Sequence, residues 1–135
     1  MSGRTIGGVV AILSVLAAVP AVAHHSFTAE YDPNKPIKMS GTVTSMKWAN
    51  PHAWIYLDIK GADGKVVNWA FETGGANSLI RRGWKKEDLP AGTHLVVEGW
   101  AARNGSSTAN ASSITFADGR RLFAGTSNTN APTTP

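Results

Sequence analysis

The sequence predicts a mainly β domain, and three observations predict it. Apolar and polar residues alternate with the period of a strand in several segments, which are rich in Val, Ile, Thr and aromatic residues. Asp-Gly and Asn-Gly pairs, typical of tight turns, fall between these segments. The period becomes helical in one interval only, so the expected order is strand-strand-strand-helix-strand-strand. This is the order of the OB-fold, a small five-stranded barrel, and a generic antiparallel sandwich is the alternative.

A long first strand and a clear second strand are predicted on either side of a proline turn. Residues 37–48 (IKMSGTVTSMKW) alternate, and Gly41 among them predicts a bulge or bend. Asn50-Pro51 marks the turn, and residues 53–60 (AWIYLDIK) follow as the second strand. One face of this strand carries Ile55, Leu57 and Ile59, and the other carries Trp54, Tyr56, Asp58 and Lys60.

A hairpin and then a short helix are expected next. Asp63-Gly64 predicts the turn into a third strand at residues 65–72 (KVVNWAFE). Its inward residues are expected to be Val67, Trp69 and Phe71. The segment ANSLIRR predicts about two helical turns ending at Gly83, a residue typical of a helix C-terminus.

The remaining strands complete an expected domain at residues 37–124. A fourth strand is predicted over residues 93–102 and a fifth over residues 111–116, with a last hairpin toward residues 121–123. Residues 125–135 are polar and of low complexity, which predicts a disordered tail. The predicted fold is therefore a small five-stranded OB-like barrel with one short helix between strands three and four.

The N-terminal residues predict export. Arg4 precedes an apolar stretch, and Ala21-Val22-Ala23 has the small-residue pattern of a signal-peptide cleavage site. The stretch is short for a membrane span, so we expect residues 1–23 to be removed and no membrane anchor to remain. The expected mature protein is periplasmic or secreted, begins at His24 and carries an N-terminal arm at residues 24–36.

Composition limits the partners. Removing 23 of the 135 residues leaves 112, enough for one small domain. Arg4 is the only charged residue removed, so the formal net charge falls from +4 to +3. The basic residues of the mature chain form short pairs that are separated in the sequence. We therefore expect no nucleic-acid partner. The chain has no cysteine, which excludes disulfides, thiol catalysis and thiolate metal sites.

Two blocks of sequence are specific, AHHSF at residues 23–27 and NPHAW at residues 50–54. Together with NWAFETGG, RRGWKKEDLPAG and DGRRLFAG, they resemble an uncharacterised family of small exported bacterial proteins, a domain of unknown function. The resemblance spans nearly the whole expected mature chain and implies export and one compact domain. It implies no activity and no catalytic residues.

The four histidines predict a copper site. If cleavage follows Ala23, His24 offers its α-amine and its imidazole to one metal ion. A second imidazole would complete a histidine brace, which resembles the copper site of lytic polysaccharide monooxygenases and of some periplasmic copper carriers. Nitrogen-rich, roughly planar sites suit Cu(II). The candidate co-ligands are His25, His52 and His94, because the expected topology allows the last two to share one end of the barrel.

Two alternatives stand beside this hypothesis. The first is that these histidines are structural or solvated and hold no metal. The second is a metal-free module that binds a glycan, a peptide or a protein partner through Trp48, Trp54 and Tyr56, because OB-folds bind ligands over strands two and three. Other elements could instead cover these rings. No nucleophile elbow, partnered serine or glycosidase-type carboxylate pair is present, so we expect a protein that is not an enzyme.

Overall fold

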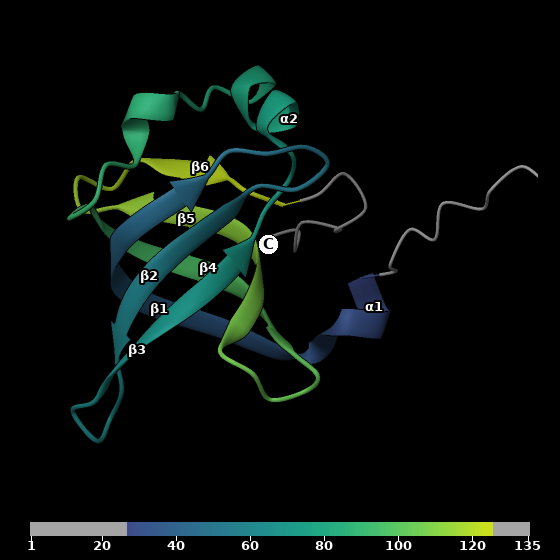
Figure 1. Cartoon of the computed structure of the whole chain (residues 1–135), viewed down its shortest axis with the longest axis vertical. Coiled ribbons are helices and arrows are strands. Elements are labelled where there is room, and N and C mark those ends of the chain that lie inside the picture. The colour runs from purple at the N-terminus through teal and green to yellow at the C-terminus, as the bar shows by residue number, and fades with distance from the viewer. Residues whose placement is uncertain (1–26, 126–135) are drawn as a thin grey trace, which may run out of the picture.

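The computed structural model describes residues 27–125, which form six strands and two short helices (Figure 1). The helices are α1 (Phe27–Glu30) and α2 (Ala76–Arg81), and a 3₁₀ turn η1 spans Lys86–Asp88. The strands are β1 (Tyr31–Lys47), β2 (Trp54–Lys60), β3 (Val66–Glu72), β4 (His94–Ala102), β5 (Thr108–Phe116) and β6 (Arg121–Phe123). The predicted mainly β class is confirmed, and so is a helix between β3 and β4.

The strands form one sheet whose first five members make a ring. Their order is β3-β2-β1-β4-β5-β6, and all neighbours in this order are antiparallel. β3 and β5 also pair in parallel at Ala70–Glu72 and Thr108–Asn110, which joins the two sides of the sheet. The sheet has six strands rather than the predicted five, because the last hairpin pairs β6 with β5.

The first strand is longer than predicted, and each half has its own partner. Its early residues pair with β4 and its late residues with β2, and Thr42 pairs with both. A Cβ on Gly41 would lie 2.6 Å from the carbonyl oxygen of Asp58, so the strand passes too close to β2 for a larger residue there. The register of this strand shifts between Tyr31 and Pro36 against β4 and between Val43 and Ser45 against β2. Residues 31–36 of the expected arm belong to β1, and α1 precedes them.

The core fills the ring and extends to the end where α2 and η1 lie, opposite the projecting β2–β3 turn (Figure 1). The predicted inward residues of β2 are buried, as is Phe71 of β3. Val67 was expected inward but is 43 % exposed, because it lies toward the β2–β3 turn, beyond the pairing with β5. No helix among residues 27–125 has the length and apolar character needed to cross a membrane.

Candidate functional site

A buried carboxylate at the end of β3 joins two polar side chains from other parts of the fold. Glu72 is only 8 % exposed. The hydroxyl of Tyr31, at the start of β1, donates to Glu72 Oε2. The Nδ1 atom of His52, in the loop before β2, lies 3.1 Å from Glu72 Oε1. We call these three residues the Tyr31–Glu72–His52 cluster.

Strand alternation explains why a carboxylate occupies this place. Phe71 points into the core, so Glu72 projects from the outer face of the ring. On that face Glu72 stands between Trp54 of β2 and Asn110 of β5, which are its paired neighbours. A buried carboxylate is costly unless it is hydrogen-bonded, and Tyr31 and His52 supply that bonding.

Tyr31 is held in its neutral form. Its side chain is 3 % exposed and its ring stacks on Phe27 of α1, with ring centroids 5.7 Å apart. Burial raises the pKa of Tyr31 well above its usual range, and the hydrogen bond to Glu72 and the negative charges of Glu72 and Glu30 raise it further. The hydroxyl of the folded protein therefore remains a donor to the carboxylate at neutral pH.

Backbone hydrogen bonds on both sides of His52 hold the loop that carries it. The backbone N–H of Ala76 donates to the carbonyl of Ala49, and the N–H groups of Ala53 and Thr73 bond across to Gly74 and Ala53. This fit requires a glycine in α2's entry turn, because a Cβ on Gly75 would lie 2.6 Å from the carbonyl oxygen of Pro51. The imidazole is thus presented from a fixed backbone.

The contacts of His52 select one arrangement of its ring. Nδ1 lies 3.2 Å from the carbonyl oxygen of Thr73 as well as close to Glu72, and both neighbours are acceptors. A proton on Nδ1 satisfies them, which leaves Nε2 of the neutral ring with its lone pair. The side chain is 40 % exposed. A carboxylate or carbonyl behind one ring nitrogen is the usual support for a histidine that binds a metal through the other.

The structure does not bring His94 to His52. His94 lies in β4 opposite Thr42, whose hydroxyl oxygen is 3.1 Å from its Nδ1. β2 begins at Trp54, opposite Lys47, which is five positions from Thr42 or about 16 Å along β1. Residues 27–125 contain no group of three or more His, Asp or Glu side chains that could hold a metal ion. His24 and His25 lie outside the described residues.

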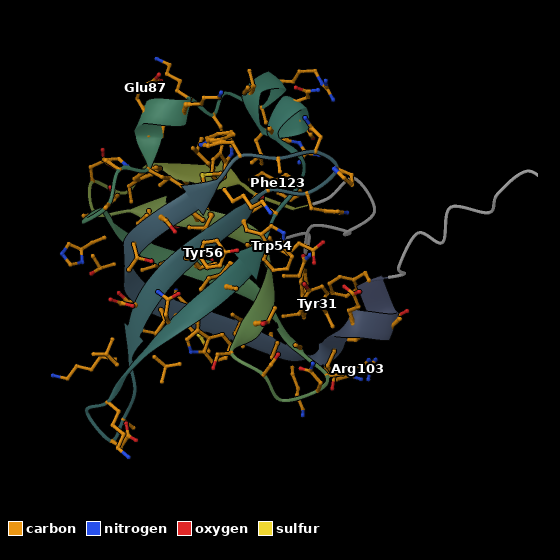
Figure 2. The ribbon with its side chains drawn as sticks, in the orientation of Figure 1. Tyr31, Trp54, Tyr56, Glu87, Arg103 and Phe123 are labelled. Atoms are coloured by element: carbon orange, nitrogen blue, oxygen red, sulfur yellow. The ribbon has the colours of Figure 1, made fainter. Side chains whose placement is uncertain are left out.

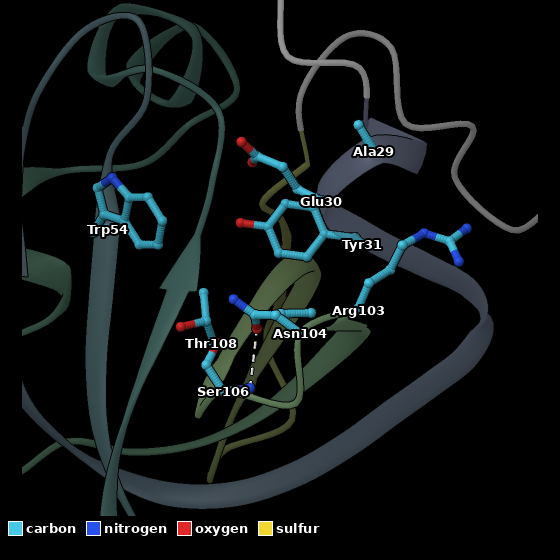
Figure 3. Close-up of a pocket in the computed structure, with 9 residues that line it drawn as sticks. Ala29, Glu30, Tyr31, Trp54, Arg103, Asn104, Ser106 and Thr108 are labelled. Atoms are coloured by element: carbon cyan, nitrogen blue, oxygen red, sulfur yellow. Dashed lines mark hydrogen bonds between the residues drawn. The ribbon is translucent and has the colours of Figure 1, made fainter.

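The three predicted aromatic residues do not share one environment, and Figure 2 labels two of them, Trp54 and Tyr56. Trp48 is half-buried and packs edge-on against buried Trp84, with centroids 6.4 Å apart, at the end of the ring near α2. Trp54 and Tyr56 are half-buried on the outer face of β2. Trp54 also lines a cavity of about 350 Å³ between α1 and the β4–β5 loop (Figure 3).

Sequence reasoning named His52 but missed its partners. The residues predicted from the sequence to form a site include neither Glu72 nor Tyr31. The predicted β2–β3 hairpin could have indicated Glu72. Its register sets Glu72 opposite Trp54, and Trp54 is two positions from His52 in the sequence. The contribution of Tyr31 had no such signal, because it depends on the path of β1.

The sequence model of a family of unknown function (DUF6152) matches residues 11–111 of the chain. No significant match was found among curated proteins or among solved structures.

Proposed function

Because the chain belongs to this family of unknown function (DUF6152), which transfers no activity to it, we propose a function from the cluster itself: the protein is an exported, non-enzymatic Cu(II)-binding protein. The proposed site is His24 as the first residue of the mature chain, with its amine and imidazole, completed by His52, and His25 is an additional candidate ligand. His94 is left out of it, because it lies on another part of the sheet. Carriage or sequestration of copper is the proposed role.

The observation that carries the proposal is the state of His52. Its Nδ1 faces Glu72 and the carbonyl of Thr73, which leaves Nε2 as the ring nitrogen available to a ligand on a half-exposed side chain. Metal-binding histidines are oriented in this way by carboxylates and carbonyls behind them. Imidazole and amine nitrogens are ligands that suit Cu(II).

The N-terminal end of the described chain supports a role for His24 and His25. Phe27 stacks on Tyr31, and Tyr31 donates to the same carboxylate that contacts His52. Three residues span at most about 10 Å, so a mature chain that begins at His24 would keep both histidines within about 10 Å of Phe27.

Export and an OB-like fold belong to the same proposal. A signal peptide at residues 1–23 would free the amine of His24, and its cleavage pattern supports this. The five-strand ring, with a helix between β3 and β4, supports an OB-like domain. Ligands of such domains bind beside strands two and three, and the cluster lies beside them.

The test is a Cu(II) titration of the exported, purified protein, read by calorimetry and EPR, with the first residue checked by intact mass. We expect one-to-one binding with a nitrogen-rich spectrum. One alanine added before His24 should abolish the tight binding, and His52→Gln should weaken it by at least about tenfold. His94→Gln is the matched control and should leave both readouts unchanged.

Two further outcomes decide the proposal. Glu72→Gln keeps a side chain of the same size but removes the charge behind His52, and it should weaken copper binding by about 10- to 100-fold. Binding that is indifferent to the added alanine, or as sensitive to His94→Gln as to His52→Gln, would overturn the proposed site.

A further inference from the structure

We propose that the cavity between α1 and the β4–β5 loop binds one residue of a neutral sugar. Its volume of about 350 Å³ is near the lower end of small-molecule sites, so it suits a single ring better than an extended peptide. The proposal does not depend on copper. The lining residues are Ala29, Glu30, Tyr31, Trp54, Ala102, Arg103, Asn104, Ser106 and Thr108.

The cavity has an aromatic wall. Trp54 of β2 and Tyr31 of β1 both line it, and in Figure 3 the Tyr31 hydroxyl points toward the side on which Trp54 lies. The apolar face of a sugar ring packs well on the flat face of an indole, which supplies contact area without requiring charge. The indole N–H of Trp54 has no hydrogen-bond partner among residues 27–125, so it is available to a ligand hydroxyl.

Neutral polar groups from the β4–β5 loop and the start of β5 also line the cavity. Asn104 Oδ1 accepts a bond from the backbone N–H of Ser106 at 3.0 Å, which orients the amide and leaves its NH₂ group. The hydroxyls of Ser106 and Thr108 have no hydrogen-bond partner within the described part of the chain. A few convergent hydroxyl and amide groups beside an aromatic ring are the groups needed to bind a polyol.

The charged and ionisable groups of the lining are already engaged, which argues for a neutral ligand. Arg103 Nε donates to the carbonyl of Thr28 at 2.7 Å, and its guanidinium lies 3.9 Å from Asp32. The Tyr31 hydroxyl donates to Glu72. A ligand carboxylate or phosphate would have to compete with Asp32 for the guanidinium, whereas a hydroxyl needs no displacement.

The test is a titration with methyl glycosides of glucose, galactose and N-acetylglucosamine, followed by saturation-transfer NMR and tryptophan fluorescence. Glucuronate and a short neutral peptide are the comparison ligands. We expect at least one neutral glycoside to bind and the comparison ligands to bind more weakly. Adding a chelator should not change the affinity, which separates this result from the copper proposal.

Variants identify the cavity. Thr108→Val keeps the shape of the side chain and should weaken glycoside binding by about tenfold, through the lost hydroxyl. Thr115→Val, farther along β5, is the matched control and should have no effect. Trp54→Phe should retain binding and Trp54→Leu should lose it, with circular dichroism confirming that both fold. The proposal is overturned if no neutral glycoside binds, if the two threonine variants behave alike, or if glucuronate or the peptide binds more tightly.

Discussion

Replacing Tyr31 with Phe removes one oxygen atom from the Tyr31–Glu72–His52 cluster and little else. The ring remains and can still stack on Phe27 at the same spacing. Glu72 loses the donor that satisfies Oε2 while staying buried, with His52 as its remaining side-chain partner. The variant therefore isolates the contribution of a hydrogen bond to a buried charge.

The expected cost at pH 7 follows from that geometry. A hydrogen bond to a charged group contributes about 1.5–3 kcal/mol to stability, and the 8 % exposure of Glu72 gives water little access to replace it. We expect the free energy of unfolding to fall by about 2 kcal/mol. For a domain of this size that corresponds to a fall in Tm of about 10 °C.

The difference between the two proteins should depend on pH, with a defined sign. In the unfolded chain Tyr31 ionises near its usual pKa of about 10, whereas in the folded chain its raised pKa keeps the proton on. Above pH 10 the folded state binds more protons than the unfolded state, so the stability supplied by Tyr31 falls as pH rises. The loss is about 1.4 kcal/mol at pH 11, and the gap to the Phe variant should shrink to about 0.6 kcal/mol.

Urea unfolding followed by tryptophan fluorescence, at pH 7, 9, 10 and 11, measures this gap directly. Tyr56→Phe is the control, because the hydroxyl of Tyr56 has no hydrogen-bond partner within residues 27–125, and it should cost less than about 0.5 kcal/mol at pH 7. A cost below about 0.5 kcal/mol for Tyr31→Phe at pH 7 would refute the reasoning. So would a gap that stays constant up to pH 11.

Three other predictions test the packing of the fold. Leu57→Ala, in the fully buried core, should cost about 2–5 kcal/mol by chemical denaturation, while Ile80→Ala on the exposed face of α2 should cost less than about 0.5 kcal/mol; equal costs would contradict the assigned core. Gly99→Ala should prevent folding or cost more than about 3 kcal/mol in the same assay, because its Cβ would lie 1.8 Å from the carbonyl oxygen of Asn110; a stable variant would show that β4 and β5 are not so close. Arg103→Met should increase hydrogen exchange and proteolysis at α1 and leave the core protected, because the guanidinium holds that helix through its backbone carbonyl; unchanged exchange at α1 would contradict this.

Much of the fold was predictable because its determinants are local. The alternation of residues 53–60 specifies a strand with a buried face, and that face is buried. Gly64 and Gly83 occupy positive-φ positions at the predicted hairpin turn and helix end. The prediction that Val67 faces inward was wrong, and the reason lies in the tertiary structure. Val67 lies beyond the end of the β3–β5 pairing, where no strand among residues 27–125 other than β2 pairs with β3.

The sequence by itself determined which segments become strands, where they turn, and that His52 follows a proline turn, because period and turn chemistry act over a few residues. Only the tertiary structure decided which polar groups meet. The Tyr31–Glu72–His52 cluster needs the β2–β3 register and a first strand that extends back to Tyr31, and the same register separates His94 from it. Contacts between residues 20 or more positions apart depend on the path of the chain through the ring, which no local pattern encodes.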